Sequence, residues 1–265
     1  MVAWGSTELQ CSSIIEILSF AAEVHGEAEI VSVRTEGDLH RQTYKEAFAR
    51  TAQLAHALDG LGVKQGDRVA TLAWNGYRHF ELYYAISGMG AVCHTINPRL
   101  SAEQMIYILN HAEDRVLFVD TTFVPILQAL QGQLPKGLKI VVMTDTAHMP
   151  DSPLAPLCYE TLLEGQASEY AWPDLPEETA AGLCYTSGTT GNPKGSLYSH
   201  RSTVLHALFG AVTLPSSVHE GARLLPVVPM FHVNAWGMPY IAPLVGASMI
   251  MPGGADGVAW FAGRD

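Results

Sequence analysis

The chain has 265 residues, of which 48% are hydrophobic and 15% charged, and its formal net charge is −11. This composition excludes a disordered or fibrous protein and is sufficient to bury a sizeable core, in one large domain or two smaller ones. The acidic balance argues against binding to a nucleic-acid backbone, which needs clustered lysine and arginine, and against a basic patch for anionic lipids. A soluble protein is the simplest prediction.

The cysteines indicate the compartment. Cys11, Cys93, Cys158 and Cys184 are far apart and show no CxxC spacing. They therefore predict neither a zinc site nor a disulfide framework. The N-terminus lacks a basic start followed by an apolar run, so no secretory signal is expected and a reducing cytoplasm is predicted.

Helix and strand signals alternate along the chain. A capping box at Thr43 and Glu46 predicts a helix that stops at Gly62. Asn75 is expected to start a second helix, and Ser101 a third. Short β-branched runs predict strands that begin at Arg68, Ala91, Arg115, Lys139, Ala180, Arg223 and Ala247.

This alternation predicts an α/β fold with layered parallel sheets and helices on both faces, because parallel strands need crossover connections. A proline-rich stretch from 150 to 178 predicts a connection between two parts. Residues 1–170 are expected to form a first α/β subdomain, and residues 171–265 the start of a second one. The pattern looks interrupted at the end, where a further helix is starting.

The stretch "YTSGTTGNPKG", residues 185–195, follows a predicted strand and precedes a helix to which Val204, Leu205, Leu208 and Val212 give an apolar face. Strand, glycine-rich turn and helix form a geometry that suits a phosphate, since glycines let backbone amides converge while hydroxyls and a lysine add donors. The predicted phosphate-binding residues are Thr186, Ser187, Gly188, Thr189, Thr190, Gly191, Lys194 and Gly195. A flexible, solvated polar loop is the alternative. The Walker A pattern does not fit, because Pro193 stands where its second glycine should be.

A second stretch, from residue 224 to residue 255, has no charged side chain over a length that could span a bilayer. Its five prolines, together with Gly237 and Gly246, would break a lipid-facing helix repeatedly. We therefore predict a buried strand, a loop, a short helix and another buried strand.

These motifs resemble those of the AMP-forming adenylating enzymes, which include acyl-CoA and aryl-CoA synthetases, firefly-type luciferases and the adenylation domains of peptide synthetases. "YTSGTTGNPKG" resembles their phosphate-loop signature. The segment from Gly62 to Asp120 is similar to the N-terminal region of the fatty acyl-CoA ligase branch, and "VVPMFHVNAWGMPY", from Val227 to Tyr240, is similar to its acid-pocket motif. The resemblance covers nearly the whole chain.

The resemblance implies that ATP activates a fatty acid to an acyl-adenylate, which coenzyme A converts to acyl-CoA with release of AMP. Lys194 and His232 would be the catalytic residues, and a hydroxyl of Thr186 or Thr189 would be a Mg²⁺ ligand. The acyl pocket would be formed by Phe231, His232, Asn234, Trp236 and Gly237. Without the resemblance, His232 fits a hydrogen-bonded core histidine, and Phe231 and Trp236 fit core aromatics equally well.

The resemblance also implies parts that cannot be assigned within 265 residues: adenine- and ribose-binding residues and a small C-terminal domain with a catalytic lysine. We therefore expect an N-terminal fragment of a ligase that is inactive alone and acts on small-molecule substrates, with a homodimer left open. One alternative is a truncated protein that binds a nucleotide or fatty acid without catalysis. The other is a generic phosphate-loop NTPase or kinase, which would form ADP.

Overall fold

Two β-sheets organise the chain, and the computed structural model describes residues 13–186 and 192–254. The larger sheet contains β3 (Arg68–Leu72), β4 (Val92–Thr95), β5 (Val116–Val119), β6 (Lys139–Val142), β7 (Leu157–Cys158), β8 (Ala180–Thr186) and β9 (Lys194–Ser199). Its spatial order is β7-β6-β5-β3-β4-β8-β9, and every neighbouring pair is parallel except β8 and β9. The parallel part confirms the predicted α/β class.

The smaller sheet combines elements from both ends of the described chain. Its strands, in spatial order, are β10 (Arg223–Leu224), β11 (Ser248–Met251), β1 (Glu29–Val33) and β2 (Leu39–Thr43). β1 pairs parallel with β11 and antiparallel with β2. Each sheet thus contains strands from both sides of residue 170, and the division into subdomains at that residue stays a prediction.

Eight α-helices connect these strands in the described ranges: α1 (Ile14–Val24), α2 (Tyr44–Gly60), α3 (Tyr77–Gly88), α4 (Ala102–Ala112), α5 (Val124–Ala129), α6 (Tyr159–Leu163), α7 (His200–Thr213) and α8 (Met238–Val245). Four 3₁₀ segments complete them: η1 (Thr121–Phe123), η2 (Gln131–Gln133), η3 (Thr146–His148) and η4 (Val233–Gly237). The predicted capping box is present, since the Thr43 hydroxyl accepts from Glu46 N at 3.2 Å and the Glu46 carboxylate accepts from Thr43 N at 2.7 Å.

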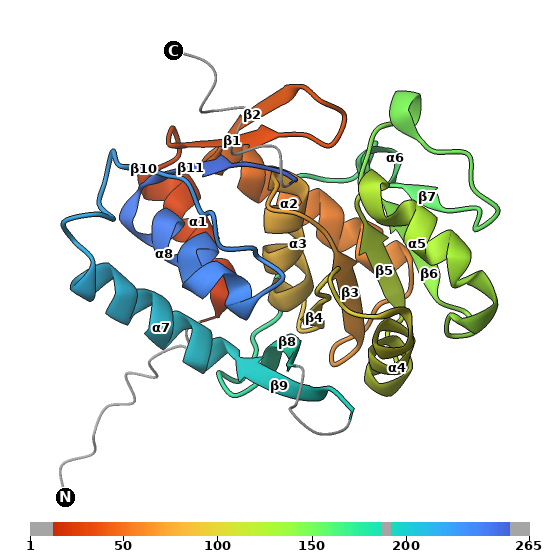
Figure 1. Cartoon of the computed structure of the whole chain (residues 1–265). Coiled ribbons are helices and arrows are strands. Elements are labelled where there is room, and N and C mark those ends of the chain that lie inside the picture. The colour runs from red at the N-terminus through yellow and green to blue at the C-terminus, as the bar shows by residue number, and fades with distance from the viewer. Residues whose placement is uncertain (1–12, 187–191, 255–265) are drawn as a thin grey trace, which may run out of the picture.

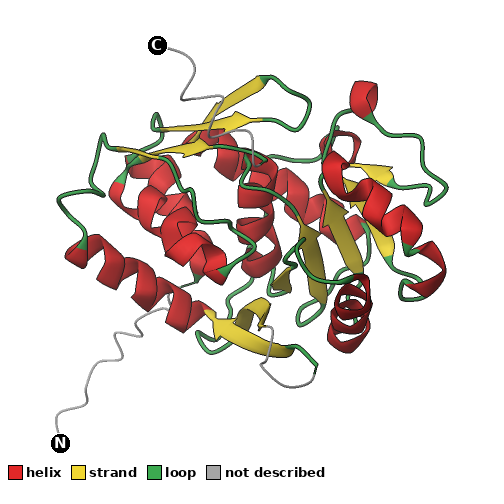
Figure 2. Ribbon diagram, viewed as in Figure 1, coloured by secondary structure: helices red, strands yellow, loops and turns green. Residues whose placement is uncertain are grey.

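The helices and sheets are arranged in layers (Figures 1 and 2). Successive residues of β3 point to opposite faces of the larger sheet. Ala70 and Leu72 pack in a core with α4 and α5, whereas Val69 belongs to the core that α1, α2, α3 and α8 share with the smaller sheet. Every residue of α3 is buried, so this helix is a fixed element inside the molecule.

Three predictions about local structure need correction. A second strand, β9, follows the phosphate-loop motif, so the motif joins the strands of a hairpin and α7 begins only at His200. Asn75 does not cap α3, because Gly76 holds that position and the Asn75 side chain bonds elsewhere. The strand expected from Arg223 is shorter than predicted, and it ends at Leu224.

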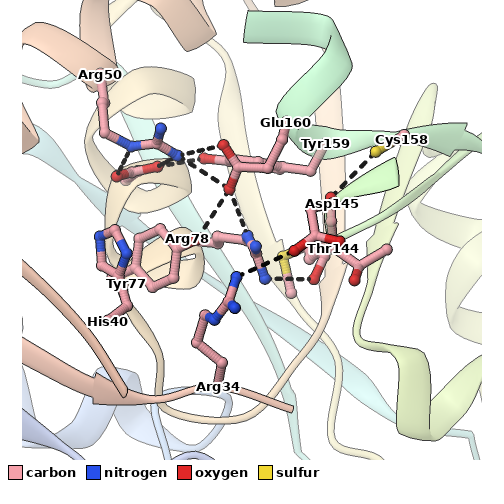
Figure 3. A network of polar contacts seen from close by, with 12 residues as sticks. Arg34, His40, Arg50, Tyr77, Arg78, Thr144, Asp145, Cys158, Tyr159 and Glu160 are labelled. Atoms are coloured by element: carbon pink, nitrogen blue, oxygen red, sulfur yellow. Dashed lines mark hydrogen bonds and ion pairs between the residues drawn. The ribbon is translucent and has the colours of Figure 1, made fainter. Parts of the chain in front are cut away.

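A buried network of charged groups ties α2, α3 and α6 together (Figure 3). Arg50 of α2 binds Glu81 of α3 at 2.7 Å and Glu160 of α6 at 3.0 Å. Arg78 of α3 binds Glu160 and Glu36, each at 2.8 Å. Burial alone would raise the pKa of Glu160, but the two arginines outweigh it and hold that pKa below its usual range. The network fixes α3 on the side that faces the smaller sheet.

Within the described residues, no helix combines the length and the apolar character that crossing a bilayer requires. The uncharged stretch near the C-terminus instead forms β10, a loop, η4 with the short helix α8, and β11. This arrangement confirms the predicted order of elements but not the predicted burial of the first strand, because in β10 Arg223 is exposed and Leu224 is half-buried.

Candidate functional site

The β8–β9 hairpin carries the first motif. Thr186, the last residue of β8, pairs with Lys194, the first residue of β9, and Tyr185 pairs with Gly195. Directly opposed residues of an antiparallel pair place their side chains on the same face, and both Thr186 and Lys194 are exposed. The remaining predicted phosphate-binding residues lie outside the described residues: Ser187, Gly188, Thr189, Thr190 and Gly191.

Gly195 fits the hairpin because it has no side chain. A Cβ at this position would lie 2.9 Å from the Leu183 Cδ1 and 3.3 Å from the Tyr185 Cζ. β8 is parallel to β4, so its end at Thr186 lies at the carboxyl edge of the larger sheet. That edge is where open α/β sheets usually bind ligands.

The second motif forms a left-handed turn. In η4 the φ angles of Val233, Asn234 and Ala235 are each 49°, and those of Trp236 and Gly237 are 57° and 77°. Non-glycine residues pay about 1–3 kcal/mol each for such a conformation, and it persists only where the surroundings enforce it. Four consecutive residues in this conformation therefore indicate that the surrounding structure enforces the turn.

Contacts from distant elements hold this turn. The Asn234 Oδ1 accepts from the Tyr83 hydroxyl of α3 at 3.3 Å and from the Cys184 thiol of β8 at 3.5 Å. The His206 Nε2 of α7 lies 3.1 Å from the Trp236 carbonyl oxygen. The turn is thus bonded to the strand that leads into the phosphate-loop motif.

A cavity of about 520 Å³ lies between α7 and the turn with α8. Its apolar lining includes Phe209, Leu214, Trp236 and Ile241, and Tyr198 of β9 contributes to the same wall. Cavities of this size and character are typical of small-molecule sites. α7 packs here through small residues: a Cβ on Gly210 would lie 2.5 Å from the Ile241 Cδ1. Val204 is buried, whereas Leu205, Leu208 and Val212, predicted to share its apolar face, are exposed.

The predicted acyl-pocket residues divide into two groups. Asn234, Trp236 and Gly237 line the cavity, and Trp236 is 65% exposed and thus no core aromatic. Phe231 and His232 are not part of its lining. Phe231 is buried, with its ring centroid 6.2 Å from that of Trp74, and His232 is exposed immediately before the turn. The roles of Phe231, His232 and Lys194 stay predictions.

The segment Trp74–Asn75, which follows β3, also belongs to this region. The Trp74 N–H donates to the Asp120 Oδ2 at 2.6 Å, and the His79 Nδ1 lies 3.0 Å from the Trp74 carbonyl oxygen. The Asn75 side chain makes three hydrogen bonds to the segment that precedes His232. We did not predict these contacts from the sequence.

Asp120 makes the stability of this segment depend on pH. Burial raises the pKa of Asp120 to about 7, although the Trp74 N–H bond opposes the shift. Since the folded-state pKa lies above the unfolded value, the stability that the protonated carboxyl contributes is lost as pH rises from about 4 to about 7, by up to roughly 4 kcal/mol.

Asp120→Asn can still accept from Trp74 N and does not titrate. The unfolding free energy of the variant minus that of the unaltered chain should therefore rise between about pH 4 and about pH 7 and stay constant above that range. Urea titrations at a series of pH values measure this difference. Parallel curves for the two proteins would contradict the assignment.

The donors at the hairpin could bind an anionic group such as a phosphate. Thr186 offers a hydroxyl and Lys194 an ammonium group on the same face of the sheet. The described residues contain no cluster of three or more histidine, cysteine or acidic side chains that could hold a metal ion. If Mg²⁺ binds at this hairpin, the Thr186 hydroxyl is the predicted ligand that lies among the described residues.

Comparison with known proteins identifies the family of this chain. Residues 18–262 match the family described as AMP-binding enzyme. The chain is 50% identical over 260 residues to a medium-chain-fatty-acid–CoA ligase of Ectopseudomonas oleovorans, and 48% identical over 250 residues to a 3-methylmercaptopropionyl-CoA ligase of Ruegeria lacuscaerulensis. These matches cover 95% and 94% of this chain but only 46% of each relative. The chain thus spans about half the length of the curated relatives it matches.

Solved structures show the same fold. An anthranilate CoA ligase, AuaEII, solved in complex with anthranoyl-AMP, superposes with a TM-score of 0.84 at 26% identity, over 96% of this chain and 47% of that one. A fatty acyl CoA synthetase of Mycobacterium tuberculosis gives a TM-score of 0.74 at 26% identity, over 90% of this chain and 44% of that one. Because the family match extends over almost the whole sequence, this chain belongs to the AMP-binding enzyme family.

Proposed function

We propose that this chain is the acid- and phosphate-binding part of an ATP-dependent fatty-acid–CoA ligase. One observation carries the proposal: the apolar cavity adjoins the β8–β9 hairpin, and residues of the two contact each other. Tyr198 of β9 lines the cavity, and Asn234 of the turn contacts Cys184 of β8. An acyl chain in the cavity and a nucleotide at the hairpin would therefore occupy adjoining parts of one site.

The reaction would proceed in two steps. The fatty-acid carboxylate attacks the α-phosphorus of ATP, so that an acyl–phosphate bond forms and pyrophosphate leaves. The thiol of coenzyme A then attacks the acyl carbon, forms the thioester and releases AMP. Neither step needs a covalent protein nucleophile, and catalysis comes from alignment and neutralisation of charge.

The residues of this chain would divide the work. Lys194 would neutralise phosphate charge, and the Thr186 hydroxyl would donate to a phosphate oxygen. Mg²⁺, when bound with ATP, would screen the phosphates further. His232 would lie near the reacting carboxylate, with Asn234 and Trp236 shaping the acyl site.

The lining of the cavity favours an aliphatic acid. Among the described residues, it contains apolar side chains, hydroxyls, Asn234 and His206, and no Asp or Glu. An amino-acid substrate would bring an ammonium group that needs such a partner. A medium-chain acid also agrees with the E. oleovorans relative, which is named as a medium-chain-fatty-acid–CoA ligase.

A chimera tests the activity directly. Residues 18–262 would replace the matching part of the E. oleovorans ligase, and AMP formation would be measured with decanoate, ATP and coenzyme A. Formation of AMP that depends on the acid supports the proposal, whereas ADP would indicate a phosphate-loop NTPase. Saturable binding of ATP or fatty acid without release of pyrophosphate would favour a binding protein.

Lys194→Met in this chimera should lower AMP formation by roughly 100-fold, because an anion-stabilising charge is removed. Lys64→Met is the matched control, since Lys64 is exposed and lies outside the site. Equal activities for the two variants would contradict the role of Lys194.

The cellular compartment and the oligomeric state of the protein are also proposals. We propose a reducing cytoplasm, with which the free Cys93, Cys158 and Cys184 agree. Association into a homodimer can be tested by light scattering of the purified chain.

A further inference from the structure

The backbone just before His232 is held from both sides, by Asn75, which precedes α3, and by Tyr83 in the middle of that helix. The Met230 N–H donates to the Asn75 Oδ1 at 2.6 Å, and the Met230 carbonyl accepts from the Tyr83 hydroxyl. Met230 is fully buried. Its two polar backbone groups thus depend on side chains about 150 residues away in the sequence.

Asn75 holds more than one residue of this segment. Its side-chain amide donates to the Pro226 carbonyl at 2.8 Å and to the Val228 carbonyl at 3.0 Å. The side chain therefore uses both N–H groups and its oxygen. Because the partners are two carbonyls and one N–H, the orientation of the amide follows from their chemistry.

Asn75 is itself firmly placed. It is 3% exposed, and its carbonyl accepts from the Gly253 N–H at 2.8 Å. The preceding residue, Trp74, is bonded by Asp120 and His79 on its two backbone groups. A side chain on such a fixed base can impose a position on the segment that it binds.

We propose that Asn75 is a positioning residue of the acid site. It fixes the Pro226–Met230 segment, so that the left-handed turn beginning at Val233 presents Asn234 and Trp236 to the cavity. This inference rests on the proposed function for the identity of the ligand. The contacts themselves do not depend on it.

The test uses the 265-residue chain and two readouts. Hydrogen exchange of peptides from residues 226–237 reports whether the segment is held, and titration with a fluorescent fatty acid, with decanoate as competitor, reports the acid site. In Asn75→Ala, with unchanged circular dichroism, exchange should accelerate and the fatty-acid Kd should weaken, each by roughly tenfold. Asn110→Ala is the matched control, because Asn110 is exposed and its side chain bonds, in the part of the chain that the structure describes, to the Ile106 carbonyl of its own helix α4.

A milder variant covers the case in which Asn75→Ala does not fold. Asn75→Asp keeps the shape of the side chain and the oxygen that accepts from Met230 N, but it removes the two N–H groups that donate to Pro226 and Val228. It should change both readouts in the same direction. Unchanged exchange would overturn the inference, and so would faster exchange with an unchanged fatty-acid Kd, which would indicate a structural role alone. If the unaltered chain binds no fatty acid, the proposed function fails instead, and exchange of residues 226–237 still decides whether Asn75 holds the segment.

Discussion

Replacement of Arg50 by methionine should lower the free energy of unfolding by about 3–5 kcal/mol, because it strands a buried carboxylate. The Glu81 side chain is 0% exposed and binds Arg50 at 2.7 Å. After the substitution, the Tyr159 hydroxyl, at 2.6 Å, would be the one hydrogen-bond partner left to it within the described residues. Urea-induced unfolding followed by circular dichroism measures the effect.

Two further variants separate this explanation from a general loss of packing. Arg50→Met combined with Glu81→Gln removes the stranded charge and should recover a large part of the loss. Arg41→Met is the surface control, since Arg41 and its partner Glu29 are 59% and 43% exposed in their side chains, and it should cost less than about 1 kcal/mol. Similar losses for Arg50→Met and Arg41→Met would contradict the importance of burial.

Replacement of Gly237 by alanine should remove most fatty-acid binding. Gly237 has a φ of 77°, and a Cβ there would lie 2.5 Å from the His206 Cδ2. His206 also contacts the Trp236 carbonyl, so moving its ring would release the turn. We expect a loss of stability of about 1–3 kcal/mol from overpacking and at least a roughly tenfold weaker fatty-acid Kd.

Gly221 provides a matched control for the backbone conformation. Its φ is also 77°, but a Cβ there would have nothing within 4 Å. Gly221→Ala therefore measures the cost of a positive φ alone, and the excess cost of Gly237→Ala measures the collision with His206. Equal stabilities and equal fatty-acid affinities for the two variants would refute the steric argument.

The predicted elements were recovered where local signals are strong. The capping box at Thr43 and the four strands β3 to β6 follow from the side-chain pattern and from local hydrogen bonding, which neighbouring residues determine. β9 was missed because its residues, KGSLYS, are mostly small or polar and its one aliphatic side chain, Leu197, is 64% exposed. Its pairing with β8 depends on tertiary context, which overrides weak local propensity.

The site was only partly predictable for the same reason. The motifs identified Asn234, Trp236 and Gly237, which line the cavity. The contribution of Asn75 could not be inferred, since an asparagine after a strand is equally a sign of a helix start. Its actual partners lie 151 to 155 residues along the chain, and a single sequence carries no signal for contacts of that kind.

The order of the smaller sheet has a consequence for synthesis on the ribosome. β1 lies between β2 and β11, and 219 residues separate Glu29 from Ser248, whose hydroxyl accepts the Glu29 amide hydrogen. At bacterial or eukaryotic elongation rates, β1 waits roughly 10 to 40 s for this neighbour. During that interval the β1–β2 hairpin presents an open edge, of the kind that invites pairing with other chains. Nascent protein should therefore need shielding of this hairpin until residue 251 has left the exit tunnel.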